Sequence, residues 1–253
     1  MPFRFPYGPV APAAARHLGK LAASGRAVAS GGGGGDPTQP VSTTAFSGDI
    51  FANQGTEPVD VTVNFPQAGD YIIVYFGSAG SVSGANDVRV QVSPFTVTEL
   101  AADDYGSGDF ESFLVVRISS VTAGDHTVSF DVETDSYGLY RGTYSVFRVI
   151  DVDDASIATD KLEDDGDVEL TSGSTVTAFI GFQFGKDDQA SSTFTGDLSQ
   201  TLFSKQELPD DNGFYMEVVW EPAVDPSTTV TMTRAIGSGD RHANALIAIP
   251  MNA

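Results

Sequence analysis

The stretch FLVVRISSVTAGDHTVSF at residues 113–130 decides the fold, because a second stretch of the same plan, YMEVVWEPAVDPSTTVTM, occupies residues 215–232. In each stretch an apolar run is followed by a polar turn and then by alternating apolar and polar residues. This pattern predicts a β-hairpin. A shift of 102 positions superimposes the two stretches without a gap, so we expect the chain to contain the same hairpin twice.

The repeat extends in both directions. Upstream, VYFG at residues 74–77 matches AFIG at residues 178–181 with a shift of 104, and downstream YSVFRVI at 144–150 matches NALIAI at 244–249. The shift of 102 aligns Trp220, the single tryptophan, with Ile118, which predicts that Trp220 lies in the core. We therefore divide the chain into a leader at residues 1–40 and two copies at residues 41–152 and 153–253, each large enough for its own core.

Both copies have the pattern of β-structure. Residues 59–65 alternate between apolar and polar, whereas residues 71–76 and 174–184 are mostly apolar and are expected to be central strands. Strand patterns recur roughly every 8–12 residues and no helical period is present. The predicted fold is all-β, with two tandem antiparallel β-sandwich domains behind an extended N-terminal arm.

The leader has a different composition. Prolines and aromatic residues alternate over residues 1–10, which favours an extended strip lying in a groove of a partner, and residues 31–35 are five glycines, typical of a flexible linker. The alternative is a disordered tail. The residues expected to contact a partner are Phe3, Arg4, Phe5, Tyr7, Arg16, Lys20 and Arg26.

Charge is distributed unevenly along the chain. The formal net charge is −21, yet residues 1–40 have four basic residues and one acidic residue, a net of +3, which leaves −24 for the rest. The acidity argues against nucleic-acid binding, which needs basic patches. A basic arm on an acidic body indicates an anchor on an acidic partner surface. No apolar run is long enough for a membrane span, and no signal peptide is evident.

Catalytic and cofactor motifs are absent from the sequence. The three histidines, His17, His126 and His242, lie in the leader or near predicted turns, and no Gly-x-Ser-x-Gly motif occurs. Paired carboxylates for glycoside cleavage are conceivable, but the acidic residues lie mostly in predicted turns. We predict no enzymatic activity and no cofactor.

Two loops that differ between the copies are candidates for recognition. The acidic loop around Glu163, Asp165 and Asp167 is a weak calcium candidate, with a solvated loop as the favoured alternative, so no metal is predicted. The loop with Tyr137 and Tyr140 has no counterpart in the second copy and is the candidate recognition surface.

The order of a central apolar strand ending in Gly77 or Gly181, a hairpin at residues 113–130 or 215–233 and a closing apolar strand resembles the jelly-roll-like β-sandwich proteins of tailed phages and related gene-transfer particles. This resemblance implies a capsid decoration, head-spike or tail-accessory protein without enzymatic activity.

We therefore expect a structural virion component that is assembled in the host cytoplasm, contacts other virion proteins through the leader and forms a homo-oligomer. It is not expected to bind nucleic acid or membrane. The alternative is a carbohydrate- or receptor-binding adhesin module that contacts a host surface glycan, and a third hypothesis is a secreted hydrolase or surface-layer protein.

Overall fold

The computed structural model describes residues 38–43, 45–51, 58–79, 87–104, 110–133, 139–163, 166–185, 191–194, 201–207, 215–235 and 242–253, and the structural statements below concern these residues. Residues 36–253 form one compact unit. Within its described part, the secondary structure consists of antiparallel β-strands and one 3-10 turn, η1 (Asp154–Ser156). The predicted all-β class is confirmed.

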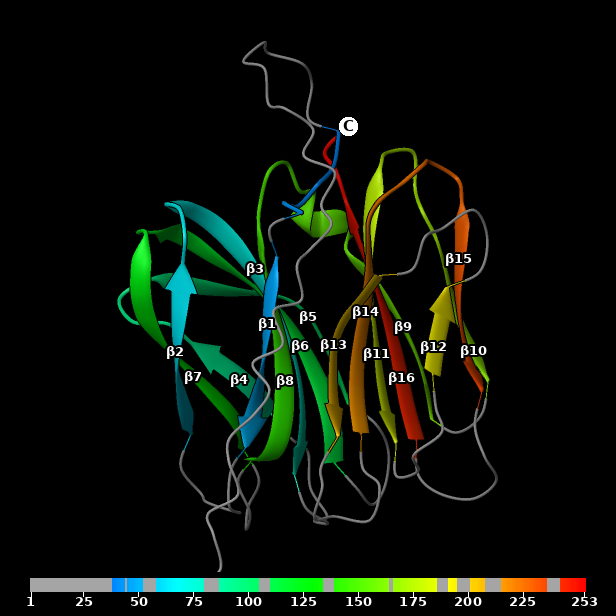
Figure 1. The fold of residues 1–253 in the computed structure, drawn as a ribbon. Coiled ribbons are helices and arrows are strands. Elements are labelled where there is room, and N and C mark those ends of the chain that lie inside the picture. The colour runs from blue at the N-terminus through cyan, green and yellow to red at the C-terminus, as the bar shows by residue number, and fades with distance from the viewer. Residues whose placement is uncertain are drawn as a thin grey trace, which may run out of the picture. The chain divides into compact units, whose positions relative to one another are not determined.

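The first half, residues 38–152, forms two sheets (Figure 1). The larger sheet has the order β1-β8-β3-β6-β5, built from β1 (Phe46–Phe51), β3 (Gly69–Ala79), β5 (Thr96–Asp104), β6 (Phe110–Val121) and β8 (Leu139–Arg148). The smaller sheet has the order β2-β7-β4, built from β2 (Val59–Phe65), β4 (Asp87–Gln91) and β7 (Gly124–Glu133).

The second half, residues 153–253, has the same plan. Its larger sheet has the order β13-β14-β11-β16-β9, built from β9 (Ala158–Glu163), β11 (Thr177–Gly185), β13 (Thr201–Glu207), β14 (Tyr215–Val224) and β16 (His242–Pro250). Its smaller sheet has the order β10-β15-β12, built from β10 (Asp167–Thr171), β12 (Ser191–Phe194) and β15 (Thr229–Ala235). When the strands of each half are counted from one to eight, both halves have the orders 1-8-3-6-5 and 2-7-4.

The two strands that were expected to be central are the middle strands of the larger sheets. In β3, the side chains of residues 71–76 are at most 1% exposed, because both faces of the sheet are covered. In β2, by contrast, Val63 and Phe65 are buried while Asp60, Thr62 and Asn64 are exposed, as expected for a strand with one face toward solvent.

A shared β-bulge fixes how the halves correspond. In the first half Gly69 pairs with Val121 and Tyr71 with Ile118, and in the second half Thr177 pairs with Val224 and Phe179 with Glu221. In both halves the longer strand, β6 or β14, has one extra residue between the two pairs. Tyr71 therefore corresponds to Phe179, and Ile118 to Glu221.

This correspondence corrects part of the sequence alignment. The shift between β3 and β11 is 108, so VYFG at residues 74–77 corresponds to FQFG at residues 182–185 instead of AFIG at residues 178–181. Between β6 and β14 the shift is 103, so Trp220 corresponds to Arg117 and not to Ile118. The shift of 102 holds for β7 and β15, where Val128 and Val230 both face inward, so the hairpin turn needs a one-residue gap.

The halves pack through their larger sheets into a four-layer body, with the smaller sheets outside (Figure 1). One apolar cluster fills this interface. Its buried first-half members are Val41, Ile72, Val74, Phe76, Phe113, Val115, Phe147 and Val152, and its buried second-half members are Ala178, Ile180, Phe182, Val218, Trp220, Ala245, Ile247 and Ile249. Trp220, 5% exposed, lies in this interface against Phe147 at a centroid distance of 5.1 Å, so its predicted core position is confirmed.

The strands that face each other across the interface are those expected if an approximate twofold axis relates the two halves. Strand β3 lies against β11 through Phe76 and Phe182, β8 against β14 through Phe147 and Trp220, and β1 contacts β13. Because β13 is the counterpart of β5, the first strand of one half lies over the fifth-strand position of the other. Two subunits of an isologous dimer would pack in the same way.

Candidate functional site

Most of the site residues predicted from sequence fall outside the described residues. This holds for Phe3, Arg4, Phe5, Tyr7, Arg16, Lys20, Arg26, Tyr137 and Asp165. Tyr140 lies in β8, Glu163 ends β9, and Asp167 is an exposed residue at the start of β10. Within the described part of the chain, no group of three or more histidine, cysteine or acidic side chains is arranged to hold a metal ion.

His126 is the histidine in the first copy, and the structure shows its surroundings. His126 lies inside strand β7 and not in a turn, and its ring is half-buried against Phe95, with centroids 4.8 Å apart. Its Nε2 is 2.8 Å from the carbonyl oxygen of Thr122. The ring of His126, near the start of β7, therefore packs against Phe95.

Three segments of the chain meet at one end of the body, which we call the junction end. The carbonyl of Pro40, close to the start of the described residues, accepts hydrogen bonds from the backbone N–H groups of Ile150 at 2.9 Å and Asp151 at 3.1 Å. The N–H of Asp153 donates to the carbonyl of Pro250 at 3.0 Å. The start of the first half, the connection between the halves and residues 250–252 are thus held together at this end.

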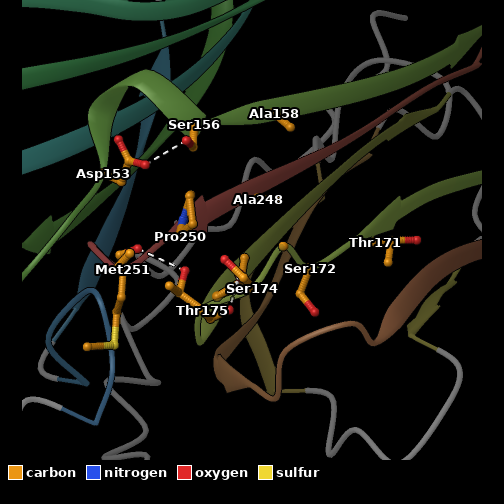
Figure 2. Close-up of a pocket in the computed structure, with 13 residues that line it drawn as sticks. Asp153, Ser156, Ala158, Thr171, Ser172, Ser174, Thr175, Ala248, Pro250 and Met251 are labelled. Atoms are coloured by element: carbon orange, nitrogen blue, oxygen red, sulfur yellow. Dashed lines mark hydrogen bonds between the residues drawn. The ribbon is translucent and has the colours of Figure 1, made fainter.

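A recess of about 170 Å³ opens at the junction end of the second half (Figure 2). Its buried floor comprises Thr177, Ala248, Pro250 and Met251. Its rim comprises Asp153 and Ser156 on one side and the turn at residues 171–175, which joins β10 to β11, on the other.

Local hydrogen bonds hold the rim in place. The Asp153 carboxylate accepts from the backbone N–H of Ala155 at 3.2 Å and from the Ser156 hydroxyl at 2.6 Å, and so caps η1. The Thr175 hydroxyl donates to the carbonyl of Met251 at 2.8 Å (Figure 2). The Ser172 hydroxyl accepts from the backbone N–H of Thr228 at 2.8 Å. These bonds fix the shape of the recess before any ligand arrives.

The chemistry of the recess is that of binding. Its lining side chains comprise hydroxyls, short apolar groups and the carboxylate of Asp153, with no histidine or lysine to act as a base. The described residues around the recess therefore supply a shaped surface of hydroxyls and short apolar groups, with the Asp153 carboxylate at its rim.

An ion triad connects the first half to the wall of this recess. The guanidinium of Arg117 donates through NH1 to Asp154 Oδ2 at 2.7 Å and through NH2 to Asp70 Oδ2 at 2.9 Å. Ser120, with a left-handed φ of 59°, donates its backbone N–H to Asp70 Oδ1 at 2.8 Å. That N–H and the Arg117 charge hold the pKa of Asp70 below its usual value. Because Asp154 belongs to η1, the triad fixes η1 against β6.

The recess residues were not predicted from the sequence, although the sequence contains one signal for them. The alignment of residues 144–150 with residues 244–249 places Arg148 opposite Ala248, and Ala248 is in the floor of the recess. Because one copy has a long charged residue at this position and the other has a small one, the surface of the two copies is predicted to differ in shape there.

No protein-family model, no curated protein and no solved structure matches the chain. The part of the chain that the structure describes includes no helix suited to spanning a lipid bilayer.

Proposed function

We propose that the protein is a non-enzymatic structural component of a phage-like particle, of the capsid decoration, head-spike or tail-accessory kind. The observation that carries the proposal is the duplicated strand order, with both halves joined through one apolar interface into a single body. The described recess offers hydroxyls, short apolar groups and a carboxylate for contact with a partner, which is in keeping with a structural role.

The strand order favours a jelly-roll-like sandwich in each half. In an eight-stranded jelly roll, strands pair so that the first lies beside the eighth and the second beside the seventh. Both halves have these neighbours, in the orders 1-8-3-6-5 and 2-7-4. The fifth strand pairs with the sixth in the larger sheet. In this pairing each half departs from a regular jelly roll, so we describe the proposed fold as jelly-roll-like.

The mechanism that we propose is anchoring. The leader, with a net charge of +3, binds an acidic surface of another virion protein, and the body, with −24, projects from it. The described body begins at the junction end, next to Pro40, so the leader joins the body there. Five glycines separate the basic residues from the body and allow its orientation to be set by the partner.

Deleting residues 1–35 tests this proposal. Because residues 36–253 form one compact unit, the truncated chain is expected to fold with an unchanged thermal unfolding midpoint. It is also expected to be missing from particles purified from the organism that encodes it, whereas the full chain is recovered with them. Fusing the leader to an unrelated globular protein is the control, and this fusion is expected to be incorporated.

Two results would refute the anchoring role. One is normal incorporation of the truncated chain, and the other is absence of the full chain from every purified particle. Quantitative mass spectrometry of gradient-purified particles measures both outcomes on the same samples.

A further inference from the structure

The recess in the second half lies where the first half has an arginine. Tyr71, which follows the bulge in β3, pairs with Arg148, and Phe179, which follows the same bulge in β11, pairs with Ala248. Arg148 and Ala248 therefore occupy the same position in the two halves. Arg148 lies in β8, beside β3, and Ala248 lies in the equivalent strand β16, beside β11.

In the first half the side chain of Arg148 covers the turn that precedes β3. Its NH2 is 3.5 Å from the carbonyl oxygen of Ala68, and a Cβ atom placed on Gly69 would lie 3.2 Å from its Nε. The guanidinium thus lies directly on the Gly69 backbone. This contact is possible because glycine has no side chain there.

In the second half the equivalent position is open. Thr177 corresponds to Gly69, so the turn at residues 171–175 is the counterpart of the turn that Arg148 covers. Ala248 ends at Cβ and lies in the floor of the recess. A volume of about 170 Å³ is well above the roughly 10–15 Å³ that a cavity needs to hold one water molecule, so the recess has room for a group larger than water.

The lining suits an arginine more than a neutral ligand. The buried parts of Ala248, Pro250 and Met251 offer an apolar surface for the methylene stem. The Asp153 carboxylate at the rim is held by Ala155 and Ser156 and still has lone pairs for a guanidinium. The net charge of the chain, −21, also attracts cations over distance.

We propose that the recess is a docking site for an arginine side chain of a protein partner, which enters the space beside Ala248. Because Thr177 has a side chain where Gly69 has none, the guanidinium lies toward Asp153 and not on the backbone as Arg148 does in the first half. This proposal is independent of the structural role proposed above, because the recess can be probed on the purified chain. It assigns the partner a solvent-exposed arginine that enters the junction end between η1 and the turn at residues 171–175.

The test is a titration of the ¹⁵N-labelled full chain with N-acetyl-arginine amide, followed by amide shifts of residues 172–175. Saturable shifts are expected, and Asp153→Asn should weaken the apparent affinity about tenfold, the loss typical of one charged hydrogen bond. N-acetyl-lysine amide, with a compact charge and no planar fork, should bind more weakly.

Two variants give each half the residue that the other half has at this position. Ala248→Arg fills the recess with the chain's own side chain and should abolish the shifts while keeping the β-sheet circular-dichroism spectrum. Arg148→Ala opens the first half and should add a second set of shifts at residues 66–69. If Ala248→Arg does not fold, the Asp153→Asn titration decides alone.

The proposal is overturned if N-acetyl-arginine amide causes no saturable shift, or if a folded Ala248→Arg variant keeps the shifts. It is also overturned if methyl glucoside shifts residues 172–175 as strongly as the arginine compound, since the recess would then be a sugar site.

Discussion

Phe76 of the first half and Phe182 of the second half stack across the interface between the halves, with ring centroids 6.0 Å apart and ring planes inclined by 13°. Both side chains are 1% exposed and belong to one apolar cluster with members from both larger sheets. Interfaces between domains that move independently are more polar than this. Each half therefore completes its packing only in contact with the other.

The shared interface predicts that both halves unfold together. Phe182→Ala should lower the free energy of unfolding by about 3–5 kcal/mol, the usual cost of removing a buried aromatic ring. In guanidinium chloride, the fluorescence of Trp220 in the interface and the far-ultraviolet circular dichroism of all strands should change in one coincident transition. Two separate transitions would contradict the single-body interpretation.

A matched control for this experiment is Thr62→Ala. Thr62 is exposed on the outer face of β2, far from the interface cluster in the sheet order. Its replacement should change the free energy of unfolding by no more than about 0.5 kcal/mol. A comparable loss in both variants would show that the effect of Phe182 is not specific to the interface.

The Arg117 triad predicts a pH-dependent contribution to stability. The pKa of Asp70 is lowered from 3.8 in the folded state, by the Ser120 N–H and then by Arg117, so its contribution is present above pH 3.8 and is lost as the pH falls below that value. Asp70→Asn should cost on the order of 1 kcal/mol at pH 7, a modest value because the carboxylate is partly exposed.

The measurement is urea unfolding of wild type and Asp70→Asn from pH 7 down to the lowest pH at which the wild type stays folded. The difference between them should narrow below pH 3.8. Asp167→Asn, at an exposed carboxylate in β10, is the control and should change little at neutral pH. A difference that stays constant or widens on acidification would show that Asp70 does not act through its charge.

The sequence predicted the central strands and the hairpin strands because burial determines their pattern, whereas β1, β5 and β9 were not predicted. Residues 71–76 are apolar without interruption since β3 is covered on both faces, and β2 alternates since one face meets solvent. Those patterns predicted the central strand and the all-β class. The face-to-face packing of the halves was not predicted, because a strand buried by a second domain has the same composition as one buried by its own sandwich.

Residue-level correspondence between the halves was predicted less well. The true match of VYFG at residues 74–77 is FQFG at residues 182–185, but Gln183 breaks the apolar pattern, and AFIG at residues 178–181 resembles it more closely. Only the position of the bulge, which depends on hydrogen-bond pairing, shows which of these two alignments of residues 74–77 is correct. The recess follows from this register, and so the sequence pattern alone did not reveal it.

The corrected register predicts the effect of a hydroxyl at the interface. Ser145 and Ala245 correspond, because they pair with Val74 and Phe182. Ser145 is fully buried, and its hydroxyl has no hydrogen-bond partner among the described residues. Ser145→Ala should raise the free energy of unfolding by about 1 kcal/mol, because it removes a polar atom that lost its water on burial.

The reverse exchange, Ala245→Ser, is the matched variant. It should destabilise the body by about 1–3 kcal/mol, since it places a second unpaired hydroxyl in the same interface. Chemical unfolding of both variants and the wild type gives the comparison. If Ser145→Ala proves as destabilising as Ala245→Ser, the hydroxyl of Ser145 makes a stabilising contact after all.

A close approach between β8 and β3 gives the last prediction. A Cβ atom on Gly142 would lie 2.8 Å from Cε2 of Tyr75 and 2.9 Å from the carbonyl oxygen of Phe76, and that oxygen cannot move without shifting the central strand. Gly142→Ala should therefore cost about 1–3 kcal/mol through overpacking. Gly173→Ala is the control, because a Cβ atom there has no described neighbour within 4 Å. Thermal unfolding of both variants measures the difference, and equal midpoints would mean that β3 and β8 separate at little cost.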